Sequence, residues 1–274
     1  MEDLLQTEKD CRIENTDCLT LMAGMPDNTV NLWNCDLPYG ISRETGFKHG
    51  NNPSYDRLKV SMDFGEWDKR EFPLAEAMAG AYRTLVKGGT AIFFYDWMKV
   101  TLLVTAMLAA GFAQLRLIEW VKTNPTPLNQ SVNYLTNARE VAVVGVKGGK
   151  PTFHGKYDNG IYLFPIARAR KGEDRHPTLK PLDLMVALTE KHTNPGDLVG
   201  DFCMGSGTAG VAALQTGRRF VGSEPEPRWF KAAEGRLKEA QSGVSIGIPA
   251  LPSNSDLPLA IQHVAVDEGT LSSE

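Results

Sequence analysis

Short apolar segments alternate with helical segments along most of the 274-residue chain, and this alternation limits the fold more than any other feature. Strands that alternate with helices predict a mostly parallel sheet covered by helices on both faces. Apolar runs predict strands at 11–15, 29–35, 90–96, 112–121, 140–147, 198–202 and 219–224. Helical patterns occupy 18–25, 71–86, 97–110, 181–192, the residues up to 216 after a glycine-rich loop, and 227–240. We therefore expect an α/β, doubly wound fold.

The chain is long enough for one large domain, which we expect to span residues 1–240. Residues 41–70 show no periodicity and predict a long loop. Residues 147–180 hold eight Lys or Arg and three acids, so the net charge of −4 hides a basic segment. We interpret 41–70 and 147–175 as insertions, the second with a charge that suits phosphate contact, and residues 241–274, which are rich in Ser, Pro and Gly and lack Lys and Arg, as a flexible acidic tail.

Several classes of protein are disfavoured by composition. The N-terminus is polar and acidic, which does not fit a signal peptide, and no apolar run approaches the length of a membrane span. The four cysteines, Cys11, Cys18, Cys35 and Cys203, show no CxxC spacing. We expect a cytoplasmic protein with reduced thiols, without a metal site and without membrane attachment.

A glycine-rich loop, DFCMGSGTAG at residues 201–210, lies between a predicted strand and a predicted helix. Gly205, Gly207 and Gly210 follow the G-x-G-x-x-G spacing, and Glu224 ends the next strand nineteen residues after Gly205. Such glycines allow a tight turn close to a ligand, and the acid suits ribose hydroxyls. The pattern predicts a cofactor that contains adenosine, either a dinucleotide or S-adenosylmethionine.

A second motif, DLPYG at residues 36–40, directly follows the strand that ends at Cys35. If this strand lies beside the strand that ends near Phe202, both loops open onto one crevice at the carboxyl edge of the sheet. An exocyclic base amine is a poor nucleophile, and two acceptors, the Asp36 carboxylate and the Pro38 carbonyl, would favour a free lone pair on its nitrogen. The Tyr39 ring would stack on a base turned out of the duplex. These features favour methyl transfer over hydride transfer.

The motifs together resemble those of the DNA amino-methyltransferases, in the circularly permuted arrangement where the catalytic motif precedes the cofactor motif. DLPY resembles the family's DPPY, DFCMGSGT resembles D-P-F-x-G-S-G-T, and HPTLKP at 176–181 resembles H-P-T-x-K-P. The similarity spans about residues 12–238. It departs from the family at Leu37 and Phe202, which replace prolines, and at Cys203, which replaces a frequent phenylalanine.

The resemblance implies a class I methyltransferase fold of Rossmann type, S-adenosylmethionine as cofactor, and a catalytic set of Asp36, Pro38 and Tyr39. It also implies a set of cofactor contacts. They are Asp17 near the adenine, Asp201, Phe202, Cys203, Gly205, Ser206, Gly207 and Thr208 in the loop, Glu224 at the ribose, and His176, Thr178 and Lys180. Basic side chains at Arg168, Arg170, Lys171 and Arg175 are interpreted as phosphate contacts, and the insertions at 41–70 and 147–175 as DNA-facing.

We therefore predict a site-specific DNA adenine methyltransferase that forms 6-methyladenine in double-stranded DNA, with a flipped target base and a possible homodimer. An acid at the first position of the motif favours adenine, because the cytosine-amine enzymes of the family usually carry serine there. Three alternatives stay open. They are methylation of the cytosine 4-amino group or of RNA, a dinucleotide-dependent oxidoreductase, and an inactive module that binds S-adenosylmethionine and nucleic acid.

Overall fold

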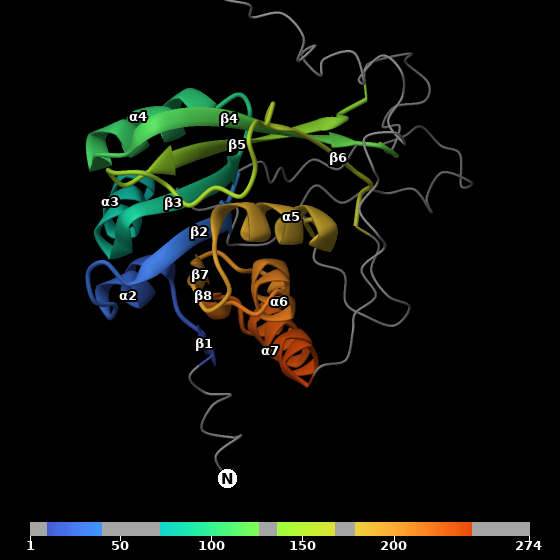
Figure 1. Ribbon diagram of the computed structural model, residues 1–274. Helices are drawn as coiled ribbons and strands as arrows, with labels where there is room; N and C mark the ends of the chain where they lie inside the picture. Colours follow the sequence, from blue (N-terminus) through green and yellow to red (C-terminus); the bar gives the residue numbers. More distant parts are fainter. Residues whose placement is uncertain (1–9, 40–71, 126–135, 168–178, 243–274) are drawn as a thin grey trace, which may run out of the picture.

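The computed structural model describes residues 10–39, 72–125, 136–167 and 179–242. Their centre is an eight-stranded sheet with the order β1-β8-β7-β2-β3-β5-β4-β6 (Figure 1). The strands are β1 Cys11–Glu14, β2 Val30–Asp36, β3 Leu85–Tyr95, β4 Ala113–Lys122, β5 Arg139–Val146, β6 Ile161–Phe164, β7 Leu198–Asp201 and β8 Arg219–Ser223. Strand β5 is antiparallel to both of its neighbours, and the other ladders are parallel, which confirms a mostly parallel sheet.

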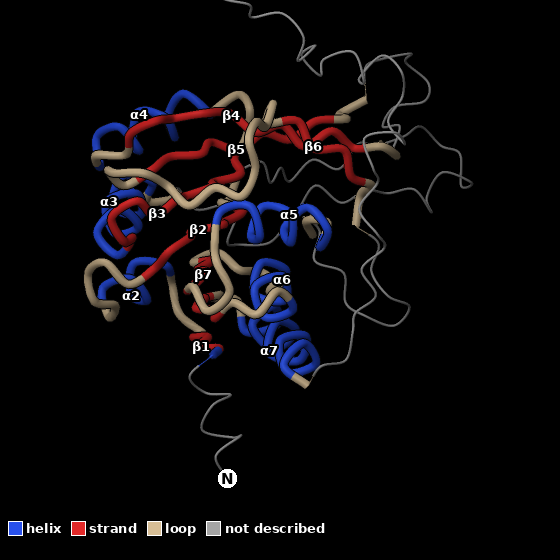
Figure 2. The backbone as a smooth tube through the Cα atoms, viewed as in Figure 1, coloured by secondary structure: helices blue, strands red, loops and turns tan. Residues whose placement is uncertain are grey.

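Helices cover both faces of the sheet, as Figure 2 shows. The helices are α2 Cys18–Ala23, α3 Leu74–Thr84, α4 Val100–Ala110, α5 Leu182–His192, α6 Thr208–Gln215 and α7 Pro227–Gln241. Alternate residues of β2 point to opposite faces of the sheet and pack in two separate cores. Leu32 packs with buried residues of α5, α6 and α7, whereas Trp33 packs with buried residues of α2, α3 and α4. The doubly wound arrangement is thereby confirmed.

The order of the strands reverses between β2 and β7. These two strands are parallel neighbours, with Leu32 opposite Val199 and Trp33 opposite Gly200. From this point the chain winds outward through β3 on one side and through β8 and β1 on the other. Ligands of open α/β sheets bind beyond the carboxyl ends of the strands at such a reversal. The DLPY motif and the glycine-rich loop therefore lie side by side at the carboxyl edge of the sheet, where the sequence predicts a crevice.

The predicted boundaries hold for most elements, with two differences. Helix α3 ends at Thr84 rather than near residue 86, and Gly88 and Gly89 lie inside β3. Gly88 has a φ of +81°, and the pairing of β2 with β3 shifts register between Val30 and Leu32. The glycine pair therefore forms an irregularity in a strand instead of a helix terminus.

The second difference is β6, which lies within the segment 147–175 that the sequence marks as an insertion. It adds an edge strand to the sheet by parallel pairing with β4. A run of four residues offers too little periodicity for prediction. The other expected insertion, 41–70, and nearly all of the expected tail, 241–274, lie outside the described residues.

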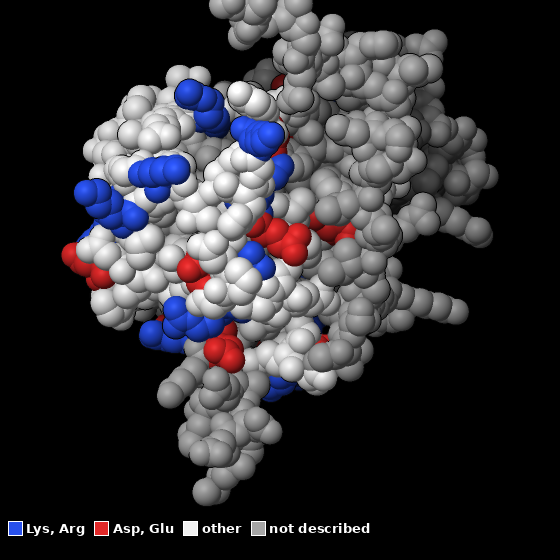
Figure 3. Space-filling view, viewed as in Figure 1, with Lys and Arg blue, Asp and Glu red and all other residues white. Residues whose placement is uncertain are grey.

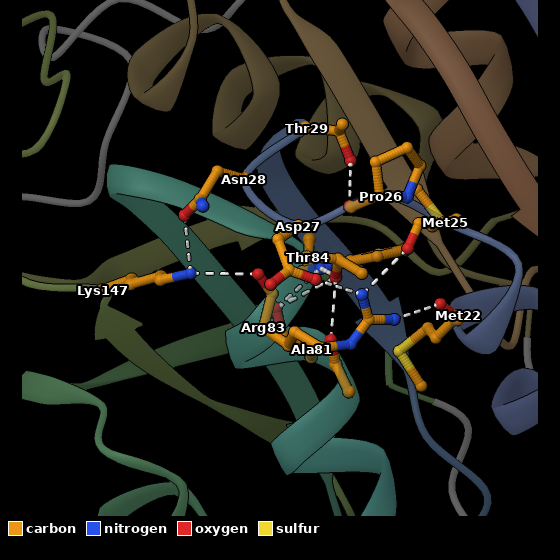
Figure 4. Close-up of polar contacts among 12 residues, drawn as sticks. Met22, Met25, Pro26, Asp27, Asn28, Thr29, Ala81, Arg83, Thr84 and Lys147 are labelled. Atoms are coloured by element: carbon orange, nitrogen blue, oxygen red, sulfur yellow. Dashed lines mark hydrogen bonds and ion pairs between the residues drawn. The ribbon is translucent and has the colours of Figure 1, made fainter.

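The end of the sheet opposite the crevice is closed by a polar network around Arg83, the penultimate residue of α3 (Figure 4). Its guanidinium donates to the backbone carbonyls of Met22 and Met25 and pairs with Asp27. Lys147 donates to the Arg83 carbonyl at 3.0 Å. The carbonyls at the end of a short helix lack partners within that helix. Arg83 supplies such partners and joins α2 to α3.

Gly210, in the first turn of α6, allows close helix packing. A Cβ atom on Gly210 would lie 2.6 Å from Leu237 Cδ2 and 2.7 Å from the Phe220 ring. Gly235, in the middle of α7, has no atom within 4 Å of such a Cβ position. The two positions form a matched pair for the same substitution.

We expect Gly210→Ala to lower the free energy of unfolding by about 1–3 kcal/mol, because the added methyl overpacks the contact between α6, α7 and β8. Gly235→Ala should leave stability unchanged or raise it by up to about 1 kcal/mol, since alanine is the better helix former. Urea denaturation followed by circular dichroism measures both. A Gly210→Ala variant as stable as Gly235→Ala would contradict the packing role.

Candidate active site

The DLPY segment begins where β2 ends. Asp36 is the last residue of the strand, and its side chain is on the same side of the sheet as Leu32, the side covered by α5. Asp36 Oδ2 lies 2.6 Å from Lys180 Nζ. Asp36 Oδ1 is buried and has no hydrogen-bond partner among the described residues. Asp36 thus has one oxygen in an ion pair and one acceptor without a partner.

Leu37, which stands where the family has a proline, has a structural explanation. Its N–H donates to the Phe94 carbonyl at 3.1 Å and extends the pairing of β2 with β3 beyond Asp36. A proline has no N–H to donate. The Leu37 side chain is buried in the core beneath α2, α3 and α4. The segment is therefore held by a hydrogen bond and by packing in place of a proline ring.

Tyr39 is half-buried and held from several directions. Lys99 Nζ donates to its carbonyl oxygen, and its ring meets the Tyr95 ring edge-on at 6.1 Å between centroids. Its hydroxyl lies 3.4 Å from Glu140 Oε2 and 3.4 Å from Lys180 Nζ. These contacts set the position of the ring beside Asp36.

Lys180 is the most deeply buried charge beside Asp36, with 4% of its side chain exposed. Its Nζ lies between Asp36 and Glu140, 3.0 Å from Glu140 Oε2. Burial acts to lower the pKa of Lys180, but the two carboxylates raise it above its ordinary value. Lys180 is therefore a permanent cation. The sequence places Lys180 at the cofactor, whereas its described partners are Asp36, Glu140 and Tyr39.

The glycine-rich loop connects β7 to α6 and is held by Glu224. Glu224 Oε2 accepts from the Gly205 N–H at 3.0 Å, and Oε1 accepts from the Glu226 N–H at 2.9 Å. Gly207 precedes α6 with a φ of +79°, and a Cβ there would lie 3.1 Å from Ala233. The loop therefore needs glycine at this position for its backbone conformation and lies against α7.

The acids beside the crevice are buried and coupled to one another. Burial raises the pKa of Asp201 to about 8, and the charges of Asp36 and Glu224 act in the same direction. Burial likewise raises the pKa of Glu224 to about 7, against the effect of its two N–H donors. Asp201 Oδ1 also accepts from the Cys203 N–H at 3.0 Å. Three carboxylates from β2, β7 and the end of β8 thus face one crevice.

Phe202 does not have the exposure that a cofactor contact of its side chain requires. Its ring is 1% exposed and packs against the rings of Trp33 and Phe93 at 5.2 and 5.7 Å between centroids. Its carbonyl accepts from Ser223 Oγ. The Phe202 side chain therefore has a packing role on the side of the sheet covered by α2, α3 and α4, and the cofactor contact of this residue stays a prediction. Cys203, the next residue, is partly exposed.

The remaining residues of the predicted cofactor set take several positions. Ser206 and Thr208 are buried, and both accept from Arg236 on α7. Asp17 is exposed and caps α2 through the Thr20 N–H, as the sequence predicts for a helix start. The loop that carries it is tied to the end of β8, because Asn15 Nδ2 donates to the Glu224 carbonyl at 2.7 Å. Asp17 thus lies on the Glu224 side of the crevice.

The other predicted site residues, His176 and Thr178, and the basic residues Arg168, Arg170, Lys171 and Arg175, lie outside the described residues. Figure 3 shows several Lys and Arg on the upper left of one face and a mixture of both signs lower down. Within the described ranges, no group of three or more His, Cys, Asp or Glu is arranged to hold a metal ion. The helices of the described ranges are all too short or too polar to cross a membrane.

Four residues beside the site are not among the predicted ones: Glu140, Lys122, Asn15 and Arg236. Glu140 starts the apolar run of β5, and a charged residue at the start of a buried strand is the signal that points to it. Lys122 ends β4 and lies 2.8 Å from Glu140 Oε1. Asn15 donates to the Glu224 carbonyl, and Arg236 donates to the Ser206 carbonyl in the glycine-rich loop. Both contacts join segments that are adjacent only in the folded chain, so no sequence signal points to them.

Known proteins are similar to this chain over most of its length. The Type II methyltransferase M2.MboI of Moraxella bovis is 28% identical over 250 residues, which cover 85% of this chain and 89% of the relative. The Type II methyltransferase M2.DpnII of Streptococcus pneumoniae is 28% identical over 244 residues, which cover 82% and 88%. The similarity therefore includes both motifs of the crevice.

Solved structures share the fold. The M1.HpyAVI complex with SAM is 26% identical, with a TM-score of 0.61 over 83% of this chain and 100% of that one. The cytosine-N4-specific PvuII DNA methyltransferase has a TM-score of 0.65 over 88% of each chain at 17% identity, and this match concerns the fold alone. The sheet and its helices therefore have the architecture of class I methyltransferases.

A family model described as DNA methylase matches residues 30–235, which run from the start of β2 into α7 and include Asp36, Lys180, the glycine-rich loop and Glu224. With the strand order, the paired loops and the relatives, this match establishes that the chain belongs to the DNA methylase family, which covers N6 and N4 methylases.

Proposed function

We propose that this DNA methylase transfers a methyl group from S-adenosylmethionine to the 6-amino group of adenine in double-stranded DNA. The observation that carries the proposal is the Oδ1 atom of Asp36, a buried acceptor without a partner among the described residues, beside Tyr39 and next to the glycine-rich loop. A buried acceptor without a partner costs free energy unless a ligand supplies a donor. An exocyclic amino group supplies such a donor.

In this proposal Asp36 Oδ1 and the Pro38 carbonyl each accept one N–H of the amine, which favours a nitrogen lone pair directed at the methyl group. The base leaves the duplex at a cost of a few kcal/mol, and stacking on Tyr39 offsets part of it. The protein supplies alignment and a fixed arrangement of charge. No side chain needs to form a covalent bond.

The cofactor is held in this proposal by the loop at 201–208, by Glu224 and by the 176–180 segment. The backbone conformation at Gly205 and Gly207 and the carboxyl group of Glu224 beside the loop support an adenosine ligand. When bound, S-adenosylmethionine supplies a methyl group activated by a sulfonium. The M1.HpyAVI structure with SAM supports this choice.

The choice of adenine depends on the carboxylate at position 36 and on the resemblance of DLPY to DPPY. The names of the Type II relatives support a role in restriction and modification. We further propose that residues 168–175 contact phosphates and that residues 41–70 contribute to recognition of the target sequence. A homodimer and the division into a domain at 1–240 and a tail at 241–274 remain parts of the proposal.

The first test removes the acceptor. We expect Asp36→Ala to abolish methyl transfer, because the amine loses the carboxylate that polarises it, while affinity for S-adenosylhomocysteine is retained. Transfer is measured with labelled S-adenosylmethionine and unmethylated DNA, and the modified nucleoside is identified by mass spectrometry. Calorimetry measures the affinity. 4-Methylcytosine as the product of the wild type would overturn the choice of adenine, and normal transfer by a folded Asp36→Ala variant would overturn the role of Asp36.

The second test concerns Glu224. If ribose hydroxyls donate to its carboxylate, binding stabilises the charged form and lowers a pKa that burial has raised to about 7. Binding of S-adenosylhomocysteine near pH 7 should then release protons, and affinity should rise as the pH rises through 7. Calorimetry in buffers of different ionisation enthalpy measures the release. We expect Glu224→Gln to reduce it, with Asp201→Asn as the control for the other raised carboxyl. Equal release by wild type and Glu224→Gln would argue against the ribose contact.

The third test concerns the basic segment. Replacing Arg168, Arg170, Lys171 and Arg175 by alanine should weaken DNA binding for all sequences. The slope of log affinity against log salt should become shallower by about 0.9 for each phosphate that the protein no longer neutralises. Fluorescence anisotropy with labelled duplexes at several salt concentrations measures the slope. A slope equal to that of the wild type would show that these residues do not contact phosphate.

A further inference from the structure

Four charged side chains of alternating sign lie in a row behind the DLPY motif. Lys122 Nζ is 2.8 Å from Glu140 Oε1, Lys180 Nζ is 3.0 Å from Glu140 Oε2, and Lys180 Nζ is 2.6 Å from Asp36 Oδ2. The exposed fractions of these side chains are 12% for Lys122, 20% for Glu140, 4% for Lys180 and 18% for Asp36. The row comes from β4, β5, the residue before Pro181, and β2. It is neutral as a whole.

Lys180 has three N–H donors, and the structure provides three acceptors for them. They are Asp36 Oδ2, Glu140 Oε2 and the Tyr39 hydroxyl at 3.4 Å. The cation is therefore shared between two carboxylates. Without Glu140, the full charge of Lys180 would be directed at Asp36, and a carboxylate paired more strongly is a weaker acceptor for a further N–H.

The charges that act on Asp36 can be named. Burial raises the pKa of Asp36, Lys180 lowers it, and Glu140 raises it. The Tyr39 hydroxyl lowers the pKa of Asp36, and the charge of Asp36 in turn raises the pKa of Asp201 at the end of β7. Glu140 itself stays charged, because Lys180 and Lys122 outweigh its burial and lower its pKa to about 2. Glu140 therefore supplies a constant negative charge at the pH of the reaction.

We infer that Glu140 is a positioning residue for methyl transfer: by sharing the Lys180 ammonium with Asp36, it keeps Asp36 Oδ1 free and a strong acceptor for the amine. The inference rests on the proposed function of Asp36. Lys122 holds Glu140 from its other oxygen, and the Tyr39 hydroxyl, 3.4 Å from Glu140 Oε2, links the ring of Tyr39 to the same carboxylate. The Glu140 side chain thus influences both the acceptor Asp36, through Lys180, and the position of the Tyr39 ring.

The test compares Glu140→Gln with the wild type in single-turnover methyl transfer across pH 5 to 9. Glutamine keeps the size and one acceptor of Glu140 but removes its charge. We expect the rate on the pH-independent plateau to fall by about 10- to 100-fold. Loss of the negative charge lowers the pKa of Asp36, so the acidic limb of the profile should move to lower pH. Affinity for S-adenosylhomocysteine should be unchanged.

The matched control is Glu119→Gln. Glu119 lies on the adjacent strand β4, is 33% exposed, and faces Arg139 at 3.8 Å. This variant should keep the wild-type rate and profile. A Glu140→Gln variant with the wild-type plateau, or with a lower plateau and an unmoved acidic limb, would overturn the inference and leave the proposed function intact. Absence of transfer by the wild type would overturn both.

Glu140→Asp is a second variant, which tests the inference if Glu140→Gln no longer binds S-adenosylhomocysteine. Aspartate retains the charge but withdraws it by one methylene group. We expect a rate within about tenfold of the wild type and an acidic limb near its wild-type position. A loss of transfer as complete as that of Asp36→Ala, in a variant that still binds S-adenosylhomocysteine, would contradict a positioning role.

Discussion

The parallel pairing of β2 with β7 is the constraint on which the site depends. It joins residues that are 167 positions apart in the chain (200 − 33) and aligns the carboxyl ends of the two strands, with Trp33 opposite Gly200. A Cβ atom on Gly200 would lie 2.3 Å from the Trp33 ring, so this glycine allows the indole to pack at the reversal of strand order. Asp36 and Asp201 emerge next to each other because the two strands are in this register.

At the crevice, the apolar interior of the sheet meets a carboxyl edge that carries several charged side chains. Up to Cys35 the side chains of β2 pack in two apolar cores, apart from the polar residues Asn31 and Asn34, and the first charged residue of the strand is Asp36. Low dielectric beside the cores strengthens the ion pairs and raises the cost of any unpaired polar atom. In the row from Lys122 to Asp36, most charged atoms form ion pairs with other members of the row. Asp36 Oδ1 is the exception: it has no partner among the described residues and can accept a hydrogen bond from a ligand.

Two departures from the family motif show how the same geometry arises from different residues. Leu37 lacks the ring of a proline, and its N–H instead bonds to β3 and its side chain enters the core. Phe202 likewise replaces a proline and fills the space between Trp33 and Phe93. In both cases packing supplies the rigidity that a fixed φ angle supplies elsewhere.

The alternation of apolar segments and the local glycine spacing are encoded over short stretches, so the class of fold and the two loops that carry Asp36, Tyr39 and Gly205 could be predicted from the sequence. It did not reveal the direction of β5, the edge strand β6 or the end of α3, since strand pairing depends on distant partners. The burial of Phe202 and the row through Glu140 to Lys180 were decided by tertiary structure alone. The ion pair between Asp36 and Lys180, 144 residues apart in sequence (180 − 36), exists only because the fold brings the end of β2 next to the residues that precede α5.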